Sequence, residues 1–294
     1  MEYNCIPFFV WAGGKRRLIK QISLYYPDKL IQGQIDNYIE PFVGGGAVYL
    51  DIMQKYRIKK STLIDLNPQV INAYIQVRDN LNALIKAISE LEQEYMSYID
   101  LSDKEKMYYD IRKKYNEYFK LDEYQAAYFL FLTKSIFNGA YRVNSKGQLN
   151  MPFGKRLNQK YYDKQNLEGI SKLLQNTNLI CGDYKKCERL ITERTFLYFD
   201  PPYRPTEKSG QLKYTKKPFT DIEQIELSDF FKISHNIGAF AMLSNSFLGD
   251  RFLETLYQDF NYNLLDNKRL MSGDSSFRKV IKEILITNYQ KGIL

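Results

Sequence analysis

The tetrapeptide Asp200-Pro201-Pro202-Tyr203 is the segment of this 294-residue sequence best suited to carry out chemistry. It follows the apolar run FLYF, which predicts a buried strand. The two prolines lack N–H donors, so they end the strand in a rigid turn with Asp200, the Pro201 carbonyl and Tyr203 facing a pocket. The carboxylate and the carbonyl then offer two acceptors to the two hydrogens of one amino group.

Two such acceptors would activate the exocyclic amino nitrogen of a nucleobase. That nitrogen is a poor nucleophile because its lone pair is delocalised into the ring. Drawing both hydrogens toward acceptors moves the nitrogen toward sp3 geometry and frees the lone pair for in-line attack on a sulfonium methyl group. Tyr203 offers a ring face to an extruded base and a π-face to the positive sulfonium. In isolation, the tetrapeptide is also compatible with an acidic turn that ends a strand.

A glycine-rich segment, residues 40–46 (EPFVGGG), follows a second predicted strand. Glycines here let the backbone approach a ligand closely at the start of a helix. No Gly-Lys-Ser/Thr follows, which excludes a Walker loop, and the dinucleotide-binding fingerprint is incomplete. Asp65 ends the next predicted strand, where an acidic residue binds ribose hydroxyls, although it also suits the start of a helix at Asn67-Pro68. Residues 11–15 (WAGGK) and Asp183-Tyr184 are weaker candidates of the same kind.

The composition favours some classes of partner and cofactor and argues against others. Lys and Arg number 42 against 34 Asp and Glu, a net charge of +8 that favours a polyanion, and the 25 Tyr and 18 Phe suit stacking on bases. Three scattered cysteines and one histidine argue against a disulfide framework and a metal site, so no metal is predicted. No signal peptide and no apolar run of about 18 residues are present, which predicts a cytoplasmic protein without a membrane partner.

Alternating strands and helices must position these residues. Strands are predicted at 36–42, 61–65, 178–181, 195–199, 237–243 and 261–265, with an antiparallel strand at 278–289. This pattern indicates an open α/β sheet with ligands at the carboxyl ends of its strands. Residues 1–78 and 160–294 would form this catalytic domain. Residues 79–159 would be an insert, helical over 81–137 and rich in turn-forming residues over 138–156, and the basic stretch 204–218 would be irregular.

Taken together, these segments resemble the Dam-like (GATC-type) DNA adenine N6-methyltransferases, whose motifs run in the order WAGGK, FxGxG, recognition insert, DPPY. The resemblance extends over nearly the whole chain. It implies a Rossmann-like S-adenosylmethionine-dependent methyltransferase fold, S-adenosylmethionine as cofactor and double-stranded DNA as partner, with a flipped adenine as methyl acceptor. It implies a catalytic group of Asp200, Pro201, Pro202 and Tyr203. The predicted cofactor site comprises Trp11, Ala12, Gly13, Lys15, Glu40, Phe42, Gly44, Asp65, Leu66, Asp183, Tyr184 and Asp200.

The family's recognition-loop pattern, NG..R.N..G.fN.PfG, is met by residues 138–154. By resemblance, Arg142 contacts a guanine, which its two-pronged guanidinium suits, and Phe137 fills the gap left by the flipped adenine. The predicted DNA-binding residues are Phe137, Asn138, Arg142, Asn144, Pro152 and Arg156. Relatives specific for GATC often have a lysine where this chain has Val10. Arg156 is the candidate for the missing donor, and GATC is the predicted target.

Other activities stay open at this point. The same chemistry fits the N4 amino group of cytosine, an adenine in RNA or a glutamine amide of a protein. A DNA-binding protein whose catalytic site has decayed is a further alternative, against which the intact DPPY and WAGGK segments argue. A restriction endonuclease of the same specificity is a possible functional partner.

Overall fold

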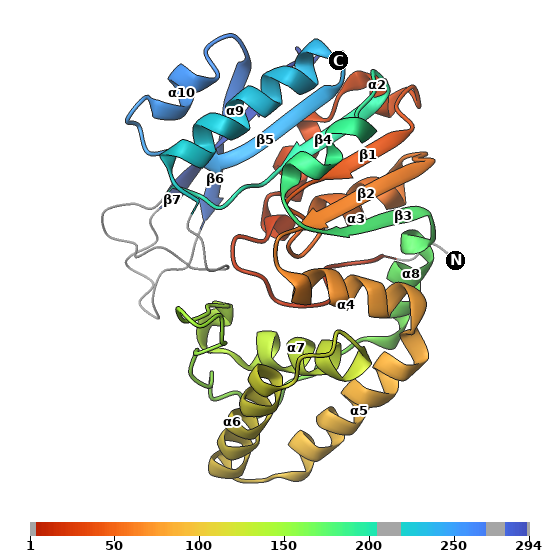
Figure 1. Ribbon diagram of the computed structural model, residues 1–294, viewed down its shortest axis with the longest axis vertical. Coiled ribbons are helices and arrows are strands. Elements are labelled where there is room, and N and C mark those ends of the chain that lie inside the picture. The colour runs from red at the N-terminus through yellow and green to blue at the C-terminus, as the bar shows by residue number, and fades with distance from the viewer. Residues whose placement is uncertain (1–3, 205–218, 269–279, 293–294) are drawn as a thin grey trace.

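The computed structural model describes residues 4–204, 219–268 and 280–292. Within these ranges the chain forms a seven-stranded sheet in the order β3-β2-β1-β4-β5-β7-β6 (Figure 1). The first five strands in this order are parallel, and β7 lies antiparallel between β5 and β6. The strands are β1 (Asn37–Glu40), β2 (Lys60–Asp65), β3 (Thr177–Cys181), β4 (Thr195–Phe199), β5 (Phe240–Ser246), β6 (Asn261–Lys268) and β7 (Val280–Thr287). The predicted α/β fold with an antiparallel C-terminal strand is confirmed.

Helices cover both faces of the sheet. On β1, Tyr38 faces the core shared with α3, α4 and α8, whereas Ile39 faces the core shared with α9 and α10. The α-helices are α1 (Ile19–Ile22), α2 (Asp28–Ile31), α3 (Ala47–Lys55), α4 (Pro68–Asp79), α5 (Leu81–Ser97), α6 (Leu101–Glu117), α7 (Glu123–Ser135), α8 (Lys164–Leu173), α9 (Asp221–Asn236) and α10 (Phe252–Leu256). None of the helices in the described ranges is long and apolar enough to span a membrane.

Helices α5, α6 and α7 form a lobe below the sheet in Figure 1. They occupy the stretch 81–137 that shows helical periodicity. Helix α7 packs against α4 and α5, and the buried residues of the lobe belong to the same apolar cluster as one face of the sheet. The lobe is therefore seated on the sheet through a continuous core. The boundaries 79 and 159 of the insert stay a prediction.

Strand β5 begins and ends three residues later in the sequence than predicted. The sequence indicated 237–243, but Ile237 closes α9, and the Ala239 N–H still bonds to the Ser234 carbonyl. Strand β5 then continues to Ser246 because β7 pairs with it as far as Glu283. The predicted irregular stretch 204–218 lies, apart from Arg204, outside the described residues.

Candidate active site

The segment that follows β4 forms the centre of the site. Asp200 comes directly after Phe199, the last residue of β4, and its side chain is 19% exposed at the carboxyl edge of the sheet. Pro201 and Pro202 cannot donate hydrogen bonds to neighbouring strands. The Pro202 carbonyl accepts a hydrogen bond from Gln224 of α9 at 3.1 Å, which fixes the turn against that helix. The Asp200 carboxylate is thus held at an edge where ligands bind in open α/β sheets.

Lys15 joins the N-terminal segment to Asp200. Its Nζ lies 2.7 Å from Asp200 Oδ1 and donates to the Gly13 carbonyl at 2.7 Å, and its side chain is only 3% exposed. The same Nζ lies 4.7 Å from the centre of the Tyr203 ring, a cation–π contact. The segments 11–15 and 200–203, nearly 190 residues apart in the sequence, therefore meet in one cluster.

The environment of Asp200 changes its acidity. Burial raises the pKa of Asp200 to about 6; Lys15 opposes this shift, and the Glu283 carboxylate adds to it. Asp200 is therefore mostly ionised at neutral pH, yet it is a stronger proton acceptor than an exposed aspartate.

Strand β7 contributes Glu283, which the sequence analysis missed. Its side chain is 3% exposed, and its Oε2 accepts a hydrogen bond from the Tyr203 hydroxyl at 2.6 Å and lies 3.9 Å from Lys15 Nζ. Its Oε1 accepts from the Asn267 side chain at 2.6 Å. The available signal was a carboxylate in a strand of apolar residues, because a buried charge requires partners. The sequence could not show that one of those partners is Tyr203.

The glycine-rich loop between β1 and α3 is held by Asp65. Its Oδ2 accepts from the Gly44 N–H at 3.0 Å and its Oδ1 from the Asn67 N–H at 2.8 Å. Gly44 has a φ of +44°, and a Cβ there would lie 2.7 Å from the indole of Trp11. Burial raises the pKa of Asp65 to about 6, opposed by the two N–H donors. The predicted cofactor residues Trp11, Gly44 and Asp65 therefore form one contact group, in which Asp65 braces the loop.

Glu40, the last residue of β1 and a predicted cofactor residue, is buried. It is 2% exposed and accepts a hydrogen bond from the Tyr38 hydroxyl at 2.6 Å. Burial raises the pKa of Glu40 to about 8, so the carboxyl group is neutral at pH 7. It supports the end of β1 from within the core.

The remaining predicted cofactor residues fall into buried and exposed sets. Tyr184 is buried and packs on the half-buried Phe42, with ring centres 5.4 Å apart. Asp183 is exposed and accepts from the Lys185 N–H at 2.9 Å, at the start of the 3-10 helix η5 (Tyr184–Leu190). Leu66 is 52% exposed, and Ala12 is half-buried. The Gly182 N–H bonds to the Asp65 carbonyl, so the ends of β2 and β3 lie side by side.

The recognition loop is anchored to the segment 11–15. Tyr141 packs on Trp11 with ring centres 5.1 Å apart. Gly139, with a φ of +65°, lies against Val10, whose Cγ1 would be 2.6 Å from a Cβ at that position. Neither Tyr141 nor this Val10 contact was predicted.

Within the loop, several predicted DNA-binding residues have structural contacts. The Asn144 side chain accepts from the N–H groups of Lys146 and Gln148, both at 3.0 Å, and so shapes the turn. The Pro152 carbonyl accepts from the Phe137 N–H at 3.1 Å, which places Phe137 with 52% of its side chain exposed.

The two candidate base-contacting arginines are exposed. Arg156 donates to Gln159 at 3.2 Å, and its carbonyl accepts from the Tyr95 hydroxyl. Asn138, also exposed, adopts a φ of +55° beside Phe137. No hydrogen bond or ion pair in the described residues joins Arg142 or Arg156 to the Asp200 cluster.

The chain is similar to known DNA methyltransferases over most of its length. A protein-family model described as D12 class N6 adenine-specific DNA methyltransferase matches residues 11–272. The type II methyltransferase M.MjaIII of Methanocaldococcus jannaschii is 41% identical over 96% of this chain and 99% of its own length. The type II methyltransferase M1.LlaDCHI of Lactococcus lactis subsp. cremoris is 36% identical over 98% and 97%, respectively. A DNA adenine methylase of Vibrio cholerae serotype O1 is 28% identical over 95% and 94%.

Proposed function

The chain belongs to the D12 class of N6 adenine-specific DNA methyltransferases, and from this premise we propose that Asp200 and Pro201 activate the adenine amino group beside bound S-adenosylmethionine. The observation that supports this assignment is the cluster of Asp200, Lys15 and Tyr203 at the carboxyl edge of the sheet. The family assignment favours adenine in DNA over cytosine, RNA or a protein amide as the methyl acceptor.

The charge of the cluster fits the proposed cofactor. Asp200 and Glu283 together carry two negative charges, and among the described residues around them Lys15 supplies a single positive charge. An excess of negative charge in a partly buried site favours a cationic ligand such as a sulfonium. Trp11, Gly44 and Asp65 would hold the adenosine part of the cofactor, where the glycine loop lets the backbone approach it.

S-adenosylmethionine, when bound, supplies an electrophilic methyl group on sulfur. The residues of the chain orient the nucleophile: Asp200 and the Pro201 carbonyl accept the two amino hydrogens of adenine, and Tyr203 packs against the base. Lys15 engages Asp200 Oδ1, which leaves Oδ2 without this cation and able to accept the amino hydrogen. As the N–C bond forms and the C–S bond breaks, the amino nitrogen loses one proton, for which the raised pKa of Asp200 makes its carboxylate a suitable acceptor.

The test compares Asp200→Ala with the parent on duplex DNA. Loss of a polar contact to the reacting group lowers turnover by a factor on the order of 10² or more, while circular dichroism stays unchanged. Mass spectrometry of nucleosides should show that the parent forms N6-methyladenine and that Asp200→Ala forms it more slowly by the same factor. The exposed Asp259 offers a matched control, Asp259→Ala, with parental turnover. Near-parental turnover of Asp200→Ala would refute the assignment.

For the target we propose that residues 79–159 select the DNA sequence and that this sequence is GATC. Support comes from the match of the loop 138–154 to the recognition pattern and from the exposed Arg142. Two relatives are named type II methyltransferases, and we propose the same protective role beside a restriction endonuclease. DNA from cells that express the chain should then resist an endonuclease that cuts only unmethylated GATC. Complete cleavage of that DNA, with N6-methyladenine present, would exclude GATC.

A further inference from the structure

Glu283 is a buried carboxylate on β7 that the proposed chemistry does not use. Strand β7 lies between β5 and β6, where Glu283 pairs in register with Ser246 and Leu265. A buried charge is costly unless it is hydrogen-bonded, and Glu283 satisfies this need with two side chains, one on each oxygen. One partner belongs to the proposed catalytic turn.

The Tyr203 hydroxyl is fixed by this carboxylate. The O–H···O distance to Glu283 Oε2 is 2.6 Å, which is short, as is usual for a hydrogen bond to an ionised acceptor. Burial first, and then the nearby carboxylates, raise the pKa of Tyr203 well above its ordinary value, so the hydroxyl keeps its proton and donates. The bond fixes the hydroxyl end of a ring whose face contacts Lys15 Nζ.

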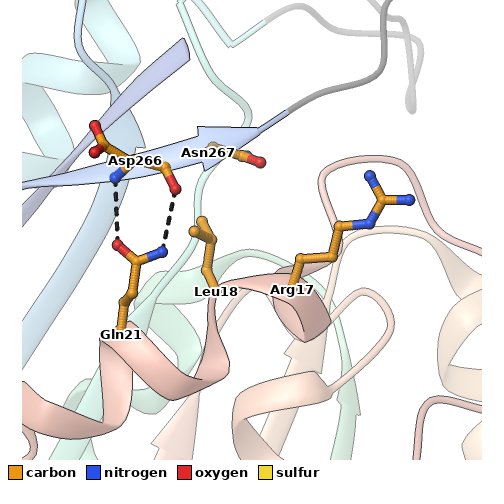
Figure 2. Close-up of a pocket in the computed structure, with 5 residues that line it drawn as sticks. All are labelled: Arg17, Leu18, Gln21, Asp266 and Asn267. Atoms are coloured by element: carbon orange, nitrogen blue, oxygen red, sulfur yellow. Dashed lines mark hydrogen bonds between the residues drawn. The ribbon is translucent and has the colours of Figure 1, made fainter. Parts of the chain in front are cut away.

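A second set of contacts holds the opposite side of Glu283. Asn267 on β6 donates to Oε1. Figure 2 shows Gln21 reaching from α1 to the neighbouring Asp266, where its amide donates to the backbone carbonyl at 3.1 Å and accepts from the backbone N–H at 3.3 Å. These residues line one side of an open pocket of about 430 Å³. Helix α1 begins four residues after Lys15. Lys15 and Glu283 are therefore linked through α1, the Gln21–Asp266 hydrogen bonds and the adjacent Asn267.

We propose that Glu283 is a positioning residue of the methyl-transfer site: it fixes the Tyr203 ring beside Asp200 and sets the charge next to Lys15, without touching the substrate. The inference rests on the proposed roles of Asp200 and Tyr203. Its electrostatic part follows from the geometry, because Lys15 Nζ lies 2.7 Å from Asp200 and 3.9 Å from Glu283, so the two carboxylates share one cation.

The test uses isosteric exchanges between carboxylate and amide. Glu283→Gln keeps the shape, but the new amide cannot accept from both Tyr203 and Asn267, because one of its two ends is a donor. We expect kcat to fall about tenfold or more, the scale of one hydrogen bond to a charged group, with KM for DNA changed less than about threefold. Removing the negative charge also lowers the pKa of Asp200, so the acid limb of kcat moves to lower pH.

A second substitution that restores the lost hydrogen bond distinguishes a positioning role of Glu283 from a contribution to overall stability alone. In the double variant Glu283→Gln/Asn267→Asp, the new carboxylate at position 267 accepts from the new amide, and the amide oxygen remains for Tyr203. We expect kcat to return to within about threefold of the parent. The control Asp266→Asn changes an exposed carboxylate on the adjacent residue of β6 and should leave kcat and its pH profile unchanged.

Two outcomes overturn the proposal: parental kcat in Glu283→Gln, or no recovery in the double variant. If Glu283→Gln does not fold, Tyr203→Phe removes the same hydrogen bond without a new buried donor, and parental kcat in that variant overturns it as well. Asp200→Ala is assayed in parallel. If it loses turnover while the Glu283 variants do not, only the positioning role fails; if it keeps turnover, the proposed site itself fails.

Discussion

Lys15 and Asp200 are a pair whose charges depend on each other. Asp200 has a pKa of about 6 because burial raises it more than Lys15 lowers it. Only the ionised carboxylate offers negative charge to Lys15 and can take up a proton from the amino group of the substrate. In the proposed role, Asp200 would therefore act above its pKa and lose this function as the pH falls through it.

We expect the rate of methyl transfer to fall on the acid side of its pH profile with a midpoint near pH 6. Lys15→Met removes the cation that lowers the pKa of Asp200, so the midpoint should move to higher pH, and turnover at pH 7 should fall. The measurement is the single-turnover rate constant of methyl transfer from pH 5 to 9, which excludes product release. Lys20→Met changes an exposed lysine of the neighbouring α1 and serves as control. An unchanged midpoint of the acid-side fall in Lys15→Met would show that the ionisation of Asp200 does not set this midpoint.

Among single residues, Asp200, Tyr203 and Lys15 could be proposed from the sequence, because unusual residue types stand together in short segments. It did not predict the 2.7 Å contact between Lys15 and Asp200, which depends on how the N-terminal segment crosses the sheet edge. Glu283 was missed because its partner Tyr203 lies 80 residues away and, beside Lys282, it looks like an ordinary charged residue in a mostly apolar strand.

Among the elements, the glycine-rich loop depends on Asp65 for its shape. Both oxygens of Asp65 bind backbone N–H groups of the loop and of the start of α4. Each oxygen retains a lone pair, so the same carboxylate can also accept from a ribose hydroxyl.

Asp65→Ala should therefore weaken S-adenosylmethionine binding by roughly tenfold or more, the scale of one charged hydrogen bond. Asp65→Asn replaces one acceptor with a donor that faces a backbone N–H, so its loss should approach that of alanine. Isothermal titration calorimetry gives both affinities. Unchanged affinity in the alanine variant would refute a role of Asp65 in the cofactor site.

Some side chains of the recognition loop stabilise the turn itself, whereas others are exposed and free to contact DNA. Asn144 shapes the turn, whereas Arg142 is exposed. Arg142→Ala should lose about 1–3 kcal/mol of discrimination at one base pair, while affinity for random DNA changes much less. The control Lys146→Ala, exposed in the same loop, should slow all sites alike. Methylation rates over all single-base variants of GATC measure both, and a uniform loss in Arg142→Ala would identify a phosphate contact instead.

Element positions were predictable where apolar periodicity is strong, as in β2 and β4, whose predicted ranges nearly coincide with the observed strands. The range of β5 was shifted because its far end is set by pairing with β7. The place of β7 between β5 and β6 depends on contacts between strands, which no local pattern carries.

For the whole molecule, the net charge of +8 should make DNA binding strongly dependent on salt. The logarithm of the association constant should fall linearly with the logarithm of salt concentration, with a slope of about −0.9 for each phosphate contacted. Lys146→Ala/Lys155→Ala removes two exposed lysines of the recognition loop and should make the slope shallower by about two. Fluorescence anisotropy between 50 and 200 mM salt tests this, and an unchanged slope would place the phosphate contacts elsewhere.

The position of β7 also has a consequence for the order in which the site is completed during synthesis. Translation delivers Asp200 and Tyr203 first, and Glu283 follows 80 residues after Tyr203, a delay of roughly 4 to 16 s at about 5–20 residues per second. Until β7 emerges from the ribosome, β6 lacks its neighbour in the sheet and the Tyr203 hydroxyl lacks the Glu283 carboxylate that accepts its hydrogen bond. A nascent chain thus carries the proposed catalytic turn well before the Glu283 carboxylate can hold it in place, and if Glu283 positions Tyr203, the synthesis of β7 sets the time at which the enzyme becomes active.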